Sequence, residues 1–193
     1  DGTAQIGMAD MVQLPAEAKV LTSTTVARDG VALVVNPANT ATELTTDQVR
    51  GIFNGTITNW KEVGGEDHKI TVVSREAGSG TRSSFEQIVG NISLSKDAIV
   101  QDSNGTIRET VANDKNAVGY LAHGLVNEKI KSLKVDGAEC KEKDIVAGTY
   151  RLVRPIFLLT KGEPAGAARD FIDYVLSPEG QDTIRKDGLL PAK

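Results

Sequence analysis

The chain has little of what several classes of protein require. Its 193 residues include one cysteine, Cys140, which excludes an intrachain disulfide and a thiolate metal site. The two histidines, His68 and His123, are far apart in sequence, and no cluster of carboxylates or thiolates accompanies either of them. That pattern argues against a metal centre and against a catalytic triad. We therefore expect no metal and no cofactor.

Long hydrophobic runs and a basic surface are also missing. No run approaches the roughly 18 apolar residues that a membrane-spanning helix needs. The longest runs, 31–35 and 156–159, predict buried strands instead. The net charge is −4 and the lysines are scattered, which argues against nucleic acid as a partner. An anionic ligand would need a local positive field, and membrane association would need an anchor outside this chain.

What the chain does contain is an alternation of short β-rich runs with segments of helical spacing, which predicts an α/β fold. The expected strands are residues 5–8, 30–35, 70–74, 118–121 and 155–160.

Three helices have clear start signals. Thr45 and Gln48 fit a capping box, and the apolar face that follows comprises Val49, Ile52 and Phe53. Pro164 predicts the first turn of a second helix, with a buried stripe formed by Phe171, Ile172, Val175 and Leu176. A third helix should start at residues 177–179 and end near Gly188.

The most informative segment is 74–82, with the sequence Ser-Arg-Glu-Ala-Gly-Ser-Gly-Thr-Arg. It follows an apolar β-run and leads into helical spacing, so a glycine-rich loop opens onto a helix N-terminus, where unpaired N–H groups and the helix dipole attract anions. Ser79 and Thr81 add hydroxyl groups, Gly80 allows close approach, and Arg75 adds a planar charged fork. The segment lacks the Gly-Lys-Ser/Thr of a P-loop. It therefore predicts a site for a small tetrahedral oxyanion.

Two places are typical of crossings between lobes, one near residues 36–37 and one near 150–155. We expect one discontinuous lobe made of residues 1–36 and 151–193. Residues 37–150 would form the second lobe, which carries the Gly-Ser-Gly-Thr loop. Two connecting strands would then act as a hinge that closes over a ligand.

Five segments in the same order resemble the PstS-like phosphate-binding proteins of bacterial ABC importers. They are 1–8 (DGTAQIGM), 29–37 (DGVALVVNP), 44–60 (through IFNG and ITNW), 74–81 (SREAGSGT) and 116–121 (NAVGYL). The resemblance implies a two-lobed periplasmic-binding-protein-like fold with a hinge, and no enzymatic activity. It also implies phosphate bound between the lobes, delivery to an ABC permease, and an extracytoplasmic location, periplasmic or as a surface lipoprotein.

The resemblance also assigns site residues. Arg75 would pair with phosphate, Ser79 and Thr81 would donate from hydroxyls and amides, and Gly80 would donate from its amide. Asp10 falls where the family places a carboxylate that accepts a hydrogen bond from protonated phosphate. An ionised carboxylate only accepts, so it would disfavour an unprotonated anion such as sulfate. The other interpretation of Asp10 is a cap on the 14–19 segment or on a turn.

Two departures from the family pattern matter. Ala77 stands where relatives often carry Asp or Glu, and Glu76 is not expected to replace it, because neighbouring positions on extended backbone point different ways. The family's N-terminal portion is missing from this sequence. The first lobe is therefore expected to be incomplete, with exposed sheet edges that favour self-association or swapping.

Other interpretations stay open at this stage. The ligand could be another oxyanion, such as sulfate or molybdate, and the chain could be a sensor or adhesion module of the same fold. A phosphoester enzyme would need a nucleophile with a base or a metal cluster, and neither is visible. Arg82 could contact an anion, but it is expected to be a solvated first-turn arginine. The loop 103–106 resembles a loop that lines a cleft, but it is expected to be a structural helix cap.

Overall fold

A computed structural model describes residues 4–192 of the chain, which form two compact units. Unit 1 comprises Asp1–Asp29 and Val153–Lys193, and unit 2 comprises Gly30–Leu152. Residues 1–3, the start of the DGTAQIGM segment, lie outside the described part. The hinge between two lobes stays a prediction.

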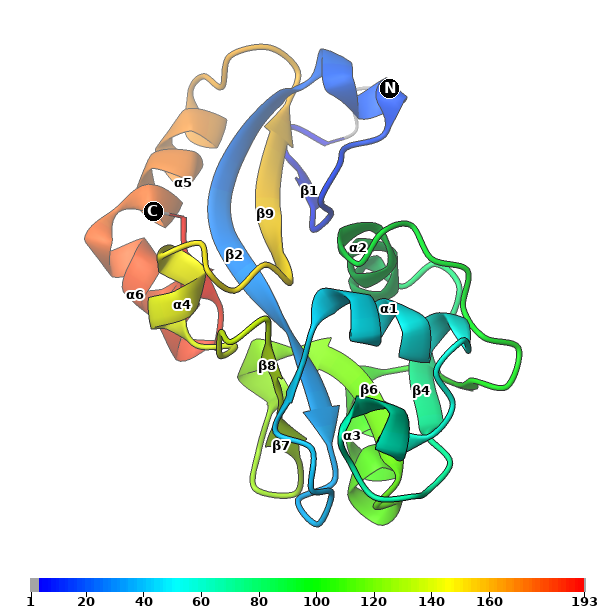
Figure 1. Cartoon of the computed structure of the whole chain (residues 1–193). Helices are drawn as coiled ribbons and strands as arrows, with labels where there is room; N and C mark the ends of the chain where they lie inside the picture. Colours follow the sequence, from blue (N-terminus) through cyan, green and yellow to red (C-terminus); the bar gives the residue numbers. More distant parts are fainter. Residues whose placement is uncertain (1–3, 193) are drawn as a thin grey trace. The chain divides into compact units, whose positions relative to one another are not determined.

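Unit 2 is a mixed sheet with helices. The second half of strand β2 (Thr22–Val35) pairs antiparallel with β6 (Ala117–Ala122), and β6 pairs parallel with β4 (Thr71–Arg75). Strand β4 then pairs parallel with β5 (Ile99–Gln101). Figure 1 shows β6 and β4 side by side, with α3 along β6. The helices and 3₁₀ turns of this unit are α1 (Thr46–Asn54), η2 (Trp60–Val63), α2 (Gly80–Ile88), α3 (Asn104–Asn113), η3 (His123–Leu125) and α4 (Glu142–Val146). The short strands are β3 (Glu43–Leu44), β7 (Lys131–Ser132) and β8 (Lys134–Val135).

The core of unit 2 explains why the apolar runs form strands. All five residues of the run 31–35 are fully buried in β2, as the sequence predicted. The rings of Phe53, Phe85 and Tyr120 pack together, and the Phe85 and Tyr120 rings stack with centroids 4.1 Å apart. These rings fix α1 and α2 against β6, which positions the loop between β4 and α2.

Local signals set most helix starts in unit 2. The capping box of Thr45 and Gln48 is confirmed at the start of α1, and the predicted apolar face of that helix is buried. Ser103 caps α3 in a box with Thr106, so the structural interpretation of the 103–106 loop is confirmed.

Unit 1 contains β1 (Gly7–Ala9), β9 (Val153–Thr160) and the first half of β2, in that order across the sheet. Strand β10 (Leu190–Pro191) pairs with β2. Two helices, α5 (Ala167–Leu176) and α6 (Pro178–Lys186), and the turn η1 (Ala16–Val20) complete this unit. Its small core groups the side chains of Val26, Leu158 and Ile172, with Ile6, Ile156 and Val175 packed against them.

Two predictions about α5 are wrong. The helix begins at Ala167 and not at Pro164, because Gly166 at its N-cap has a positive φ of 55° that breaks the helical path. Only part of the predicted stripe is buried, since Ile172 is 3% exposed while Phe171 is 50% exposed. One narrow face of α5 therefore meets the core. The start of α6 at Pro178, capped by Ser177, is as predicted.

Candidate functional site

The segment 74–82 folds as the sequence predicted. Strand β4 ends at Arg75 and α2 begins at Gly80. The loop between them turns at Gly78, whose φ of +96° is a conformation that glycine adopts without strain. Ser79 caps α2, and its Oγ accepts a hydrogen bond from the backbone N–H of Arg82 at 3.3 Å.

Hydrogen-bond donors converge at this helix end. Gly80 and Thr81 are the first two residues of α2, so their N–H groups have no partner within the helix. Ser79 and Thr81, whose side chains carry further hydroxyl donors, are 6% and 4% exposed. Helix α2 has no acidic residue in its first turn to offset the positive end of its dipole. The arrangement can hold an oxyanion by neutral donors in a poorly hydrated place, where such bonds are stronger.

The sheet topology brings a second helix end to the same place. Strands β4 and β5 are parallel, with Arg75 opposite Gln101, so both strands end at one edge of the sheet. Helices α2 and α3 start just beyond that edge. In open α/β sheets, ligands bind at the carboxyl ends of strands. Arg75 is the last residue of β4 and therefore lies at the edge where an anion would bind.

Contacts on both sides hold the Arg75 side chain. Its Nε and Nη2 donate to the two carboxylate oxygens of Glu76 at 2.8 and 2.9 Å. Longer bonds of 3.4 Å reach the Oδ1 of Asn104 and the carbonyl of Asp102, at the start of α3. The whole side chain of Arg75 is 12% exposed. It is a fixed, directed cation and not a freely rotating one.

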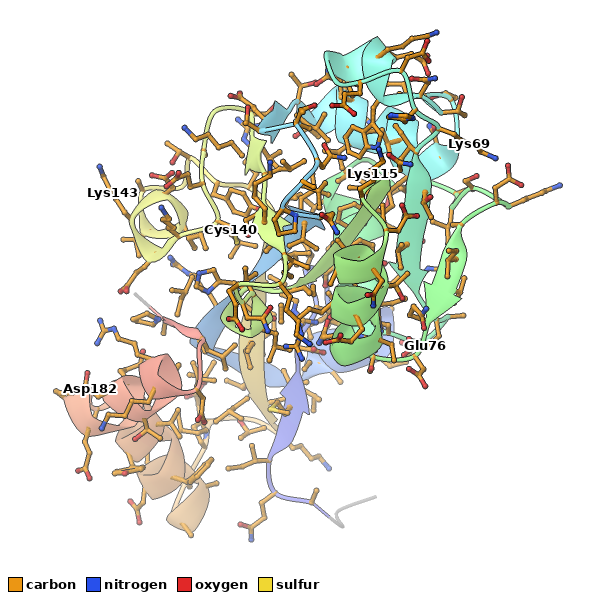
Figure 2. The ribbon with its side chains drawn as sticks, turned by 90° about the horizontal axis from the view of Figure 1, so that it is seen from below. Lys69, Glu76, Lys115, Cys140, Lys143 and Asp182 are labelled. Carbon is orange, nitrogen blue, oxygen red and sulfur yellow. The ribbon has the colours of Figure 1, made fainter. Side chains whose placement is uncertain are left out.

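The pairing with Glu76 corrects the expectation drawn from Ala77. From the sequence, Glu76 was not expected to replace the carboxylate that relatives often carry at position 77. The structure shows a two-point ion pair, because β4 ends at Arg75 and the chain then leaves the alternating strand geometry. The hydrogen bonds from Arg75 lower the pKa of Glu76. Figure 2 labels Glu76 near the end of this strand.

Arg82 is not solvated as expected. Its Nε donates to Glu86, one turn further along α2, at 2.7 Å, and its Nη1 donates to the carbonyl of Arg75 at 3.0 Å. The side chain is 21% exposed. Arg82 therefore links the end of β4 to the first turns of α2, which stabilises the loop between them.

Tyr120 is a second support that sequence reasoning missed. Its hydroxyl lies 2.7 Å from the Oγ of Ser74 and accepts a bond from the backbone N–H of Arg75 at 3.3 Å. Burial raises the pKa of Tyr120 above its usual value, so its hydroxyl resists ionisation more than that of a free tyrosine. The segment NAVGYL contains this tyrosine, but no spacing rule links it to Arg75.

Asp10 lies in unit 1, directly after β1, and the interpretation of Asp10 as a cap on the 14–19 segment is wrong. The turn η1 has Pro15 at its N-cap, and proline carries no side-chain acceptor. Asp10 instead accepts a hydrogen bond from Arg154 at 2.7 Å, and its side chain stays 46% exposed. Arg154 also pairs with buried Asp29. No local motif points to Arg154, which sits 144 residues away from Asp10.

The structure thus brings Arg75, Ser79, Gly80 and Thr81 together at one edge of unit 2. The participation of Asp10 in the same site stays a prediction, as do the ligand roles of all five residues.

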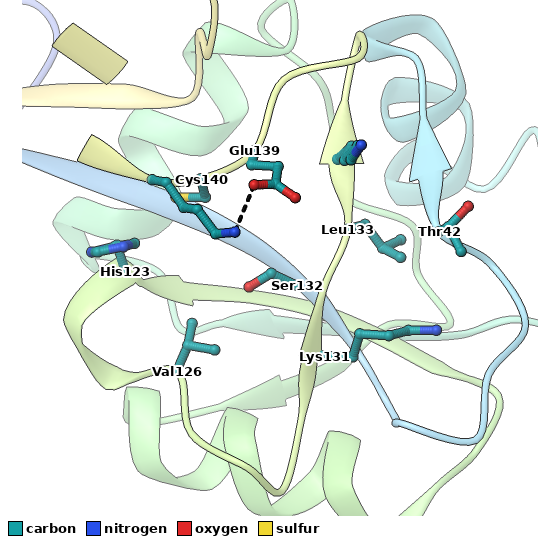
Figure 3. Close-up of a pocket in the computed structure, with 10 residues that line it drawn as sticks. Thr42, His123, Val126, Lys131, Ser132, Leu133, Glu139 and Cys140 are labelled. Carbon is teal, nitrogen blue, oxygen red and sulfur yellow. Dashed lines mark ion pairs between the residues drawn. The ribbon is translucent and has the colours of Figure 1, made fainter. Parts of the chain in front are cut away.

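A separate cavity of about 380 Å³ lies elsewhere in unit 2. Figure 3 shows residues that line it, among them His123, Cys140 and several lysines. Two of these lysines are engaged, since Lys131 donates to the carbonyl of Asn39 and Lys141 pairs with Glu139. None of the predicted site residues lines this cavity. The wall of this cavity is mainly apolar, and the contacts of Lys131 and Lys141 with protein groups reduce their capacity to bind an anion there.

Within residues 4–192, no group of three or more His, Cys, Asp and Glu residues is placed to hold a metal ion. Across the same residues, no helix combines the length and the apolar character needed to cross a membrane.

Comparisons with known proteins agree with this fold. A family model for the PBP superfamily domain matches residues 1–179. The phosphate-binding protein PstS of Bacillus subtilis is 36% identical over 196 residues, which cover 99% of this chain and 65% of that protein. The chain therefore spans less than two thirds of the length of that curated relative.

Two solved structures are also similar. One is a phosphate ABC transporter substrate-binding protein from Clostridium perfringens, solved with bound phosphate. It is 38% identical with a TM-score of 0.88, and the match covers 100% of this chain and 81% of that one. The other is an ABC-type phosphate transport receptor from Vibrio cholerae, 37% identical with a TM-score of 0.89, covering 98% and 80%.

Proposed function

Because the chain belongs to the PstS-like phosphate-binding proteins of ABC transporters, within the PBP superfamily, we propose that it binds inorganic phosphate and delivers it to an ABC importer permease. Members of this family are binding proteins and not enzymes. The observation that carries the proposal is the convergence of Arg75 with the N-terminus of α2 at one edge of the sheet.

In this proposal the phosphate oxygens accept hydrogen bonds from the amides of Gly80 and Thr81 and from the hydroxyls of Ser79 and Thr81. Arg75 supplies the positive charge through Nη1, whose contact with Asn104 is 3.4 Å long and easily exchanged. Glu76 keeps the guanidinium in place by its two short bonds. The net charge of −4 makes this local field necessary, because the whole protein does not attract anions.

Asp10 would complete the site from unit 1, as the family resemblance implies, with the two units closing over the ligand as lobes. Its exposed carboxylate would accept a hydrogen bond from phosphate, which carries a proton near neutral pH, and would repel sulfate, which does not. Uptake by an ABC importer places the protein outside the cytoplasmic membrane.

The substitution Gly80→Pro tests the role of the helix N-terminus directly. Gly80 is the first residue of α2, where proline is well tolerated, and Ser79 before it has φ −66° and ψ 122°, which suit a residue that precedes proline. The substitution therefore deletes one N–H donor and leaves the helix able to form. Loss of a hydrogen bond to a charged ligand should weaken phosphate binding by about tenfold or more.

Calorimetric titration with phosphate near neutral pH, and with sulfate as the control ligand, measures this effect. Glu142→Pro at the first position of α4 is the matched variant, since Lys141 before it also has extended backbone. We expect Glu142→Pro to bind phosphate like the wild type. Absence of saturable phosphate binding by the folded wild-type chain would refute the proposed function. If wild type and Gly80→Pro bind phosphate with equal affinity, the amide of Gly80 does not contact the ligand.

A further inference from the structure

Unit 1 contains a buried arginine shared by two carboxylates. Arg154, on β9, is 7% exposed, and Asp29, on β2, is 2% exposed. The Nε and Nη2 of Arg154 donate to Oδ2 of Asp29 at 3.0 and 2.7 Å. Its Nη1 donates to Oδ2 of Asp10 at 2.7 Å and reaches the Asp10 carbonyl at 3.4 Å. One guanidinium thus binds Asp29 on one side and Asp10 on the other.

The three groups differ in their access to solvent. Asp29 and Arg154 are buried, whereas the side chain of Asp10 is 46% exposed. Arg154 donates to Oδ2 of Asp10, and the half-exposed carboxylate keeps further lone pairs that can accept a hydrogen bond from a ligand. The contact of Arg154 with the Asp10 carbonyl, at 3.4 Å, is longer and weaker. Asp10 is therefore held mainly by its side chain, although it follows a strand of three residues.

Stability alone is a weak reason for such an arrangement. Taking an ion pair out of water costs about as much as its attraction returns, and apolar residues of similar volume often serve as well. The Asp29–Arg154 pair is buried in this way, and the Nη1 of Arg154 donates to the half-exposed carboxylate of Asp10. Because Asp29 holds the arginine in place, the arginine in turn restricts the orientation of the Asp10 carboxylate.

We propose that Arg154, anchored by Asp29, is a positioning residue that sets ligand specificity by fixing Asp10 as a hydrogen-bond acceptor. This inference rests on the proposed function. A fixed acceptor oxygen gains a hydrogen bond from a protonated tetrahedral oxyanion such as hydrogen phosphate. It repels an unprotonated dianion such as sulfate, because a fixed Asp10 cannot turn away. Arg154 thereby controls the preference for phosphate over sulfate without itself touching the ligand.

The double variant Asp29→Asn/Arg154→Gln separates positioning from charge. The wild-type group of two carboxylates and one guanidinium has a net charge of −1, and Asp10 alone in the double variant has the same charge. Amide side chains can still hydrogen-bond with each other in the buried position. Phosphate and sulfate are titrated by calorimetry from acidic to alkaline pH, and thermal unfolding of each variant is recorded.

We expect the double variant to lose about tenfold or more of the phosphate-to-sulfate affinity ratio. The phosphate affinity should also depend less on pH, because a mobile Asp10 no longer favours the protonated form of the ligand by accepting its hydrogen bond. A merely structural role would lower the unfolding temperature and leave the ratio unchanged, and that result would overturn the inference. If the double variant does not fold, Arg154→Lys decides, since a single ammonium can pair with Asp29 but cannot span both carboxylates. An unchanged ratio in Arg154→Lys would then overturn the inference. A wild-type chain that binds no phosphate would instead refute the proposed function.

Discussion

The substitution Arg75→Ala tests the proposed anion site most directly. The short bonds of the Arg75 guanidinium, 2.8 and 2.9 Å long, go to Glu76, whereas its contacts with Asn104 and Asp102 are 3.4 Å long. An oxyanion that approaches Nη1 therefore displaces a weak bond and leaves the strong pair intact. The gain from a hydrogen bond between charged partners is about 1.5–3 kcal/mol. Since about 1.4 kcal/mol changes an equilibrium constant tenfold, Arg75→Ala should weaken phosphate binding roughly 10- to 150-fold.

Glu76 adds a second effect that makes the prediction more specific. Without Arg75, the Glu76 carboxylate stands near the ligand with no cation to neutralise it. The double variant Arg75→Ala/Glu76→Ala should therefore bind phosphate more tightly than Arg75→Ala alone, so the two substitutions are not additive. Arg75→Lys keeps the charge but cannot hold Glu76 and the ligand in one plane, and we expect an intermediate affinity.

Calorimetric titration with phosphate measures the whole set under one condition. Arg151→Ala is the matched control, because Arg151 is exposed in unit 2 and its loss changes the net charge equally. Thermal unfolding of every variant confirms that the fold is kept. If Arg75→Ala binds phosphate as tightly as Arg151→Ala, Arg75 is not a ligand residue and the charge of the site has another source.

Two further predictions concern stability. Gly180→Ala in α6 should destabilise the protein by about 1–3 kcal/mol, because a Cβ there collides with the backbone carbonyl of Tyr174. Gly105→Ala in α3 places its Cβ no closer than 3.7 Å to another atom, so it should leave the stability unchanged or raise it. Chemical denaturation of both variants measures the two changes in the free energy of unfolding. Burial raises the pKa of Tyr150 well above its usual 10.0, and its hydroxyl donates to the Val31 carbonyl. The native state therefore keeps a proton that the unfolded chain releases above about pH 10, so stability should fall as pH rises beyond that value. The slope should be less steep in Tyr150→Phe, by up to about 1.4 kcal/mol per pH unit, and unchanged in the half-exposed control Tyr174→Phe; equal slopes in all three proteins would contradict this account.

Much of the fold was readable from short-range sequence signals. The run 31–35 is fully buried in β2, and the Thr45 capping box opens α1, because burial and capping depend on nearby residue types. The anion loop was predictable for the same reason, since its strand, glycine turn and helix start are contiguous in residues 74–82.

Two short-range predictions failed on α5, one because of an unusual backbone angle and one because of how the helix packs. Pro164 looked like a helix start, but the φ of 55° at Gly166 delays α5 to Ala167. Phe171 is 50% exposed because only a narrow face of α5 packs against the core. Helical periodicity predicts which residues share a face, but it does not predict how wide the buried part of that face is.

The sequence by itself therefore determined the α/β class, the caps and the loop with Arg75 and Ser79. Only the tertiary structure decided which side chains hold the predicted site residues: Tyr120 behind Arg75, and Arg154 beside Asp10. The physical reason is that a backbone turn is set by residues next to one another, whereas these two contacts join residues that only the pairing of strands distant in sequence brings together. Asp10 and Arg154 are 144 residues apart in the chain, and the pairing of β1 with β9 places them at bonding distance.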